Sequence, residues 1–374
     1  MSRGPAPSRP GHHTLLPGQA PDGAPVLAVL LKRSYRLVPG DVAVRAEADE
    51  PLRPADEHWD APENSSVRHE SDFVPCKLAT DVVFEARAHA PDGRAVAELE
   101  AAIQVADRVR RLAITGPRRV LSGPGGRPVF SDPQPFTSLS VVYERAYGGI
   151  DVRSDPERAL PYPRNPAGCG FVVSDAPRAW HDLRLPNVEA VDDRLTPERL
   201  CLGDYGRWES APVPAGWGWR GRTLWPRSSL AGVMPGDRSV ERELRALYAR
   251  FLRGTDREAY LRQTLPEMDF RFFSGASEGL SLPWLRGDEP VRTLYLSPEG
   301  RLDFRLPGER PEIGLDLGEG VQVPGTVLQT VFVAMENRRI DMVWRAAVPY
   351  PGPDWLPQAR RLAVQVVEGG EITA

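Results

Sequence analysis

Residues 326–350 read TVLQTVFVAMENRRIDMVWRAAVPY, and this stretch decides the fold that we expect. Val, Ile, Phe and Trp occur in its two halves, and these residues favour strands. The polar group Glu336–Arg339 separates the two halves and marks the place where the chain folds back on itself. The stretch therefore predicts two antiparallel strands joined by a short turn.

The same order of strand, turn and strand recurs along the chain. VRTLYL and RLDFRLPG flank the turn Ser297–Gly300, and TDVVFEARAHA and RAVAELEAAIQVA flank Pro91–Gly93. In the second turn, proline presets φ and glycine accepts a positive φ, which favours a hairpin. DRVRRLAITG follows as a third antiparallel strand, and RRLAVQVVEG predicts a last strand. These runs predict a mainly β (α+β) fold with an antiparallel β-sandwich or barrel-like body.

One stretch has the periodicity of a helix instead. Between Asp237 and Arg253 the apolar residues recur every three or four positions, which places them on one face of a helix. Thr255 and Glu258 form a capping box for a second, shorter helix, and Pro266 ends it. We therefore expect one helical hairpin, inserted at residues 236–265.

The chain is expected to divide into four segments. Residues 1–20 lack periodicity and predict a flexible tail. Two β-rich regions, residues 21–235 and 266–374, flank the helical hairpin and are expected to pack on each other. Residues 150–235 are dense in proline, glycine and tryptophan, which predicts long ordered loops that their tryptophans pin to the core.

Composition excludes several classes of partner. The 374 residues carry a net charge of −4, so no basic field exists to bind nucleic acid or an anionic membrane. The longest apolar run near the start, Val26–Leu31, is too short to cross a membrane, and the first residues contain no apolar signal core. Three cysteines spread along the chain indicate a reducing compartment. We expect a cytoplasmic protein.

The motifs of common enzymes are absent from the sequence. It contains no G-x-S-x-G, no phosphate-binding P-loop and no H-E-x-x-H. Residues 216–221 match G-x-G-x-x-G, but they follow no strand and their tryptophans would block a dinucleotide, so we interpret them as a tight aromatic loop. We therefore expect no catalytic residue, no metal and no cofactor.

Carboxylates leave one enzymatic alternative open. Asp269, Asp288, Glu289 and Asp303 could meet in a cleft as an acid/base pair. The alternative function is accordingly a hydrolase that uses a carboxylate pair on the loops of residues 150–235 or 266–305.

An ordered series of short motifs resembles a known family. The strings are SDFVPCKLATDVVF, YERAYGG, NPAGCGF, LPNVE, PAGWGWRGRTLWPRSSLAG and IDMVWR, in this order along the chain. They resemble a bacterial family of unknown function whose members are encoded near type VI secretion genes. The resemblance implies a non-enzymatic adaptor or chaperone that binds a secreted effector and loads it onto the secretion spike or its PAAR-type tip. A third hypothesis is a structural β module of the secretion machine.

Two interpretations of the motif residues stay open. Gly148 and Gly149 follow an expected strand and predict a turn with positive φ. If Tyr143 and Arg145 point into the body, Arg145 needs a carboxylate partner and the motif is structural. If Glu144 instead faces a cleft, it helps to bind a partner. The motif positions, which we interpret as structural, are Tyr143, Glu144, Arg145, Gly148, Gly149, Asn187 and Glu189.

The aromatic segment near residue 220 has the composition of a protein-binding surface. Tryptophan and arginine dominate the contacts that carry most of the energy of protein interfaces. The candidate binding residues are Trp217, Trp219, Arg220, Arg222 and Trp225. This hypothesis requires that one or two of the tryptophans are exposed, and we expect Trp217 or Trp219 to be so. The alternative is that all of the tryptophans fill the core.

Overall fold

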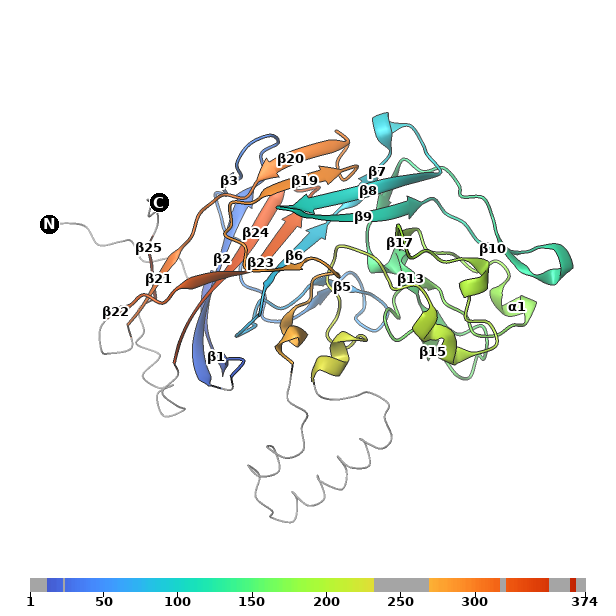
Figure 1. Ribbon diagram of the computed structural model, residues 1–374, viewed down its shortest axis with the longest axis horizontal. Coiled ribbons are helices and arrows are strands. Elements are labelled where there is room, and N and C mark those ends of the chain that lie inside the picture. The colour runs from blue at the N-terminus through green and yellow to red at the C-terminus, as the bar shows by residue number, and fades with distance from the viewer. Residues whose placement is uncertain (1–11, 23, 232–268, 317–320, 350–363, 368–374) are drawn as a thin grey trace, which may run out of the picture.

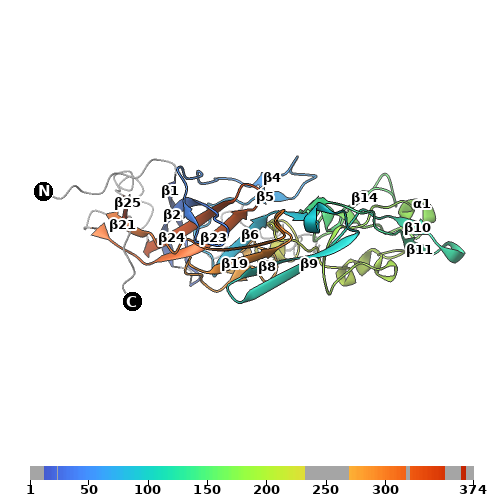
Figure 2. The ribbon, with the colours of Figure 1, turned by 90° about the horizontal axis from the view of Figure 1, so that it is seen from above.

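The computed structural model describes residues 12–22, 24–231, 269–316, 321–349 and 364–367, and its body consists of two sheets that lie face to face (Figures 1 and 2). The seven-stranded sheet contains, in order, β1 (His13–Gln19), β2 (Pro25–Arg36), β24 (Arg339–Pro349), β23 (Thr326–Ala334), β6 (Thr80–Glu85) and β18 (Ser281–Leu282), with β3 (Val44–Arg45) beside β2. The five-stranded sheet contains, in order, β17 (Val188–Ala190), β9 (Arg108–Thr115), β8 (Glu98–Val105), β19 (Pro290–Leu294) and β20 (Arg301–Arg305).

The main core lies between these two sheets. Val29 and Trp344 from the larger sheet and Ile103 and Val291 from the smaller sheet belong to one cluster of buried side chains. Every second residue of β8 is buried, as expected for a strand with one face on a core. The mainly β, antiparallel sandwich is thus confirmed. Within the described residues the sheets stay open and do not close into a barrel.

Three predicted strand pairs are confirmed. β23 and β24 pair antiparallel from Thr326 with Ala346 to Ala334 with Arg339. β19 pairs antiparallel with β20, and β8 pairs antiparallel with β9. In each case the two strands are neighbours in the sequence, so the turn between them brings the partners together.

The hairpin predicted around Pro91–Gly93 is wrong. Asp92 and Gly93 have positive φ values of 52° and 67°, so the turn itself forms. However, β7 (Arg87–His89) before the turn pairs with β12 (Ser138–Ser140), whereas β8 after it pairs with β9 and β19. The first run begins with β6 of the larger sheet, whereas the second run forms β8 of the five-stranded sheet, and both bury apolar residues in the core between the sheets. This placement in two sheets overrides the local hairpin signal.

The first and last predicted segments have different outcomes. The flexible tail is wrong for residues 13–19, which form β1 and pair with β2 from Pro25 to Leu31. This edge of β2 is open to β1 because β24 pairs with the opposite edge. The predicted last strand is confirmed, since β25 (Val364–Val367) pairs with β21 (Glu312–Asp316). The helical hairpin at 236–265 lies outside the described residues.

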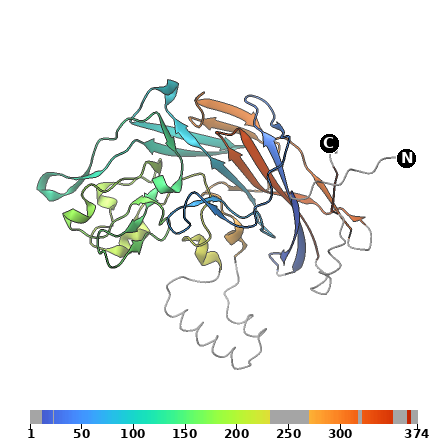
Figure 3. The same cartoon turned by 180° about the vertical axis from the view of Figure 1, so that it is seen from behind.

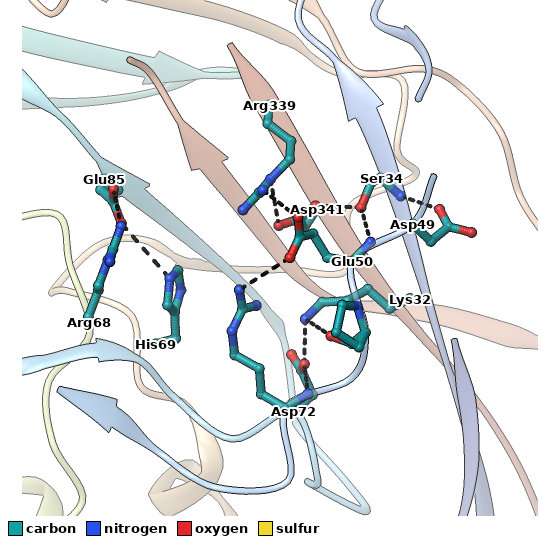
Figure 4. A network of polar contacts seen from close by, with 12 residues as sticks. Lys32, Ser34, Asp49, Glu50, Arg68, His69, Asp72, Glu85, Arg339 and Asp341 are labelled. Carbon is teal, nitrogen blue, oxygen red and sulfur yellow. Dashed lines mark hydrogen bonds and ion pairs between the residues drawn. The ribbon is translucent and has the colours of Figure 1, made fainter. Parts of the chain in front are cut away.

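A polar network covers the outer face of the larger sheet (Figure 4). Lys32 of β2 donates to Asp72 at 2.5 Å, and the Ser34 hydroxyl donates to Asp341 of β24 at 2.6 Å. Arg339 makes an ion pair with Glu50 at 2.6 Å, so residues 49–72 are fastened across the sheet. The network explains why β2 is buried on both faces although it carries polar residues.

A second region, which we call the loop lobe, consists of residues 117–134, 146–187 and 191–213 and lies beside one end of the sandwich (Figure 3), with β17 of the five-stranded sheet between its last two segments. It has little regular structure but a buried core of its own, which includes Tyr147, Tyr162, Phe171, Trp180 and Leu185. The expectation of long ordered loops in this part of the chain is confirmed for its described residues. Their aromatic side chains form a core separate from that of the sandwich.

The remaining elements are short. The other strands are β4 (Glu57–His58), β5 (Val67–His69), β10 (Val120–Ser122), β11 (Pro128–Phe130), β13 (Tyr147–Gly148), β14 (Ile150–Asp151), β15 (Leu160–Pro161), β16 (Cys169–Gly170) and β22 (Val321–Gln322). The described helices are α1 (Pro177–Trp180) and the 3₁₀ turns η1 (Pro91–Gly93), η2 (Pro124–Gly126), η3 (Tyr143–Arg145), η4 (Pro197–Arg199), η5 (Tyr205–Ser210), η6 (Arg227–Ala231) and η7 (Phe270–Phe273).

Candidate functional site

The motif Tyr143–Arg145 forms a turn, η3, at the junction of the sandwich and the loop lobe. Sequence alternation predicted a strand here, which is wrong, because the amide of Ala146 closes the turn on the carbonyl of Tyr143 at 3.1 Å. Tyr143 is buried, and its hydroxyl lies 2.8 Å from the Ser277 hydroxyl. Burial raises the pKa of Tyr143, so this side chain is a neutral structural group.

The other two residues of the turn bind neighbouring segments. Glu144 accepts hydrogen bonds from the Ser66 amide at 2.7 Å and from the Ser66 hydroxyl at 2.9 Å. Arg145 donates to the side-chain oxygen of Asn187 at 3.1 Å. The expected carboxylate partner of Arg145 is therefore wrong: an amide oxygen takes that place, and burial lowers the pKa of the guanidinium.

The glycines of the motif permit a close approach of backbone. Gly148 and Gly149 have φ values of 145° and 119°, which confirms the expected positive φ. A Cβ atom on Gly148 would lie 2.1 Å from the carbonyl oxygen of Asn165. Asn165 itself donates to the carbonyls of Tyr143 at 2.8 Å and Tyr147 at 3.1 Å. YERAYGG and NPAGCGF thus belong to one set of hydrogen bonds, which we call the Asn165 network.

Asn187 and Glu189 attach the loop lobe to the five-stranded sheet. The Asn187 side chain donates to the Thr115 carbonyl at 2.9 Å, across the pair formed by β17 and β9. Glu189 is buried, makes an ion pair with Arg118, and accepts from the Leu195 amide at 2.7 Å. Burial raises the pKa of Glu189 against the effect of Arg118. Both residues have the contacts of structural groups.

Trp217 and Trp219 are buried, which corrects the expectation that one of them is exposed. Their exposed fractions are 1% and 5%, and both belong to the main core. The Trp217 carbonyl accepts from the Phe84 amide of β6 at 2.9 Å, so the segment is attached to the larger sheet. A Cβ on Gly216 would lie 3.2 Å from the Tyr143 ring. Gly216 therefore allows close packing of this segment against Tyr143, and the large area of the tryptophan rings drives their burial.

A buried charge cluster fixes the segment that follows. Glu70 is buried and makes ion pairs with Arg222 at 2.8 Å and with Arg227 at 2.7 Å. Burial raises the pKa of Glu70, and Arg227 opposes that effect most strongly among its neighbours. Beside them, Lys77 makes an ion pair with Asp81 at 2.6 Å. Arg222, a candidate binding residue, thus forms an ion pair with Glu70 inside the protein.

Two hollows open on either side of η3. The first, which we call the aromatic hollow, has a volume of about 110 Å³, and its walls include Val67, Tyr143, Asn165, Trp219, Arg220 and Trp225. The second, which we call the charged hollow, has a volume of about 490 Å³, and its walls include Arg68, Glu85, Arg87, Glu144, Arg145 and Glu336. Of the five candidate binding residues, Trp219, Arg220 and Trp225 line the aromatic hollow, whereas Trp217 and Arg222 do not.

The arginines of the two hollows differ in their partners. In the charged hollow, Arg68 makes two hydrogen bonds of 3.0 Å to Glu85, and Arg87 lies 3.3 Å from Glu336. In the aromatic hollow, Arg164 donates to the carbonyls of Glu209 and Ala211 at 3.1 and 3.3 Å. The Arg220 side chain has no hydrogen bond or ion pair within the described residues.

The carboxylates considered for a hydrolase lie elsewhere. Asp269 pairs with Arg271, and Asp303 pairs with Arg301 at 2.7 Å. Glu289 accepts from the amides of Arg286 and Gly287, and neither it nor Asp288 lines one of the two hollows.

Other residues of the site escaped prediction from sequence. Ser66 binds the motif residue Glu144, and Glu70 holds the supporting charge cluster, but neither Ser66 nor Glu70 belongs to a quoted motif. Arg227 lies in the motif PAGWGWRGRTLWPRSSLAG, yet it is not among the candidate residues. Their partners lie far away along the chain, so no local pattern could have revealed them.

Two features are absent from the described residues. In that part of the chain, no three His, Cys, Asp or Glu side chains lie together so that they could hold a metal ion. None of the described helices combines the length and the apolar character that crossing a bilayer requires.

Fold and site together define a β-sandwich protein with a loop-built face at one end. A family model described as an uncharacterized protein conserved in bacteria (DUF2169) matches residues 22–345, and the chain belongs to this family. The matched range includes the five-stranded sheet, the loop lobe, both hollows and the larger sheet except β1 and the last residues of β24. No curated protein and no solved structure matches the chain. The family description names no activity, so the function is argued from the site.

Proposed function

We propose that this protein is a non-enzymatic adaptor that binds another protein at the aromatic hollow. The observation that carries the proposal is the composition of the hollow: Trp225 and Arg220 are half-buried at a concave site, and the Arg220 side chain has no hydrogen bond or ion pair within the described residues. Half-buried tryptophan and arginine beside a hollow are typical of the residues that contribute most to protein binding.

The walls of the hollow are rigid, which favours binding. Four of the residues that line it are prolines, Pro62, Pro166, Pro214 and Pro226, and proline has a fixed φ. The Asn165 network fixes one wall of the hollow, and the hydrogen bonds between Glu144 and Ser66 fix another. A preformed site loses little conformational entropy when a partner binds.

The more specific proposal concerns the partner. The order of the sequence motifs resembles the type VI secretion adaptors, and this resemblance supports a cytoplasmic chaperone that binds a secreted effector and loads it onto the spike or PAAR-type tip. The geometry of the hollow supports the binding of a protein, and the motif order supports the identity of that protein.

Co-expression with the proteins encoded beside its gene tests the proposal. The tagged chain should co-purify with one of them as a stable complex, and Trp225→Ala should weaken that complex by about 2 kcal/mol, roughly thirtyfold. The matched control is Trp284→Ala, because Trp284 is 40% exposed and lies outside both hollows.

Two results would contradict the proposal. If the wild-type chain forms no complex with any of these proteins, the adaptor function is wrong. If Trp225→Ala binds as tightly as the wild type, while both proteins melt at the same temperature, the aromatic hollow is not the binding site.

A further inference from the structure

The charges of the aromatic hollow are unbalanced. Arg164 and Arg220 both line it, and Glu63 is the one carboxylate among the described residues of its walls. No ion pair joins Glu63 to either arginine within the described residues. In the charged hollow, by contrast, Arg68 and Arg87 each have a glutamate partner. The aromatic hollow therefore carries uncompensated positive charge in a partly desolvated place, where an anion is attracted most strongly.

Arg220 is held by its backbone while its side chain is left available. Its amide donates to the Gly275 carbonyl at 2.8 Å, and its carbonyl accepts from the Arg227 guanidinium at 2.5 Å. Arg227 is itself fixed by Glu70. The position of the Arg220 Cα is thus determined by the buried charge cluster, so the guanidinium can meet a ligand without reordering the main chain.

The volume of the hollow limits what can enter it. The aromatic hollow, at about 110 Å³, is much smaller than the charged hollow at about 490 Å³, which favours a single side chain as its occupant. Val67, Leu224 and the four prolines make the walls mainly apolar. The occupant is therefore an apolar side chain with an anionic group close to it.

We infer that the aromatic hollow binds a segment of the partner protein in which one aliphatic residue lies next to a carboxylate. The aliphatic side chain fills the hollow, and the carboxylate accepts two hydrogen bonds from the Arg220 guanidinium. The carboxylate is either an Asp or Glu side chain or the C-terminus of the partner. This inference rests on the proposed function and names the chemistry that the same site recognises.

Peptide display on the purified full-length chain tests the inference. One library presents random internal octapeptides, and a second presents octapeptides with free C-termini, so the two sources of the carboxylate are separated. We expect enriched peptides to contain Leu, Ile or Val next to Asp or Glu in the first library, or at the free C-terminus in the second. Enrichment in either library supports the inference and identifies the source.

Matched variants locate the binding. For the best synthetic peptide, Arg220→Glu should lower the affinity at least about tenfold, whereas Arg220→Lys should keep part of it, since lysine retains the charge without the planar fork. Ala167→Phe should also abolish binding, because Ala167 lines the hollow and the larger side chain fills it. Arg108→Glu is the control, since Arg108 is exposed on β9.

Three outcomes would overturn the inference. They are enrichment of peptides without a carboxylate, an affinity that Arg220→Glu leaves unchanged, and the absence of any enriched peptide. Each of them is distinguishable from a failure of the proposed function. A chain that co-purifies with its partner but fails the peptide test is an adaptor that uses other contacts, whereas a chain without a partner fails the co-expression test itself.

Discussion

The sandwich and the loop lobe are stabilised in different ways. The sandwich is held by long strand ladders and by the apolar cluster between its sheets, which includes Trp344 and Ile103. The loop lobe has short ladders of two or three residues, and side chains such as Asn165 bind its backbone groups. A single polar side chain therefore matters more in the lobe than on most of the sandwich surface, and the lobe forms one wall of the aromatic hollow.

The largest effect that we expect comes from Gly148→Ala in the loop lobe. The new methyl group would overlap the Asn165 carbonyl at 2.1 Å, and the φ of 145° is unfavourable for alanine. We expect a loss of about 4 kcal/mol or more in the free energy of unfolding. Gly40→Ala is the control, because Gly40 has a φ of 75° but no atom lies within 4 Å of the place that its new Cβ would take, and it should cost about 1–2 kcal/mol.

Native-state hydrogen exchange measures where Gly148→Ala acts. The Gly149 amide, which donates to the Asn165 carbonyl, should lose its protection, whereas the amides of β24 should keep most of theirs. Equal loss of protection in both regions would show that lobe and sandwich unfold as one unit, which would contradict the comparison.

The second effect concerns the buried charge cluster around Glu70, which fixes residues 222–227. Glu70→Gln leaves Arg222 and Arg227 without their buried carboxylate, and we expect a loss of about 3 kcal/mol, measured by denaturant unfolding. Glu299→Gln is the matched control, because the pair of Glu299 with Arg338 is exposed and should contribute less than about 1 kcal/mol. Similar losses in both variants would mean that the buried cluster contributes no more to stability than an exposed ion pair.

The third effect is the contribution of the Asn165 network to stability. Asn165→Ala removes the donors of the buried carbonyls of Tyr143 and Tyr147, and we expect a loss of about 2–3 kcal/mol together with weaker partner binding. The exposed Asn64 supplies the control variant Asn64→Ala, which should change stability by less than about 0.5 kcal/mol. If Asn165→Ala has normal stability and normal partner binding, the role that we assign to Asn165 is wrong.

The smallest effect belongs to the sandwich side and depends on pH. Burial, reinforced by Arg53 and Arg68, lowers the pKa of His69 from 6.5 to about 3. The unfolded chain therefore takes up a proton below pH 6.5 while the folded chain does not, so this contribution to stability is complete above pH 6.5 and is lost progressively towards pH 3. Between pH 7 and 5.5 the wild type should lose about 1 kcal/mol more than His69→Gln. Equal losses would show that His69 titrates normally.

The sequence predicted the sandwich better than the site, and particular residues show why. β23 and β24 are neighbours in the chain, so their pairing follows from local patterns. β7 and β8 are also neighbours, but β7 pairs with the distant β12, and β8 pairs with the distant β19 in addition to β9, which follows it. No local pattern encodes the pairing with the distant strands. The burial of Trp217 depends in the same way on what covers it, and a tryptophan on a core and one on a binding surface look alike in sequence.

The central claim is that binding takes place at the aromatic hollow, and hydrogen exchange of the complex tests it most directly. Exchange is measured by mass spectrometry on the chain alone and with the partner found by co-expression. We expect new protection in residues 58–67, 164–167 and 213–226, the segments that supply the walls of the hollow, and little change in β2 or β24. Protection confined to the strands of the sandwich, with these three segments unchanged, would contradict the account.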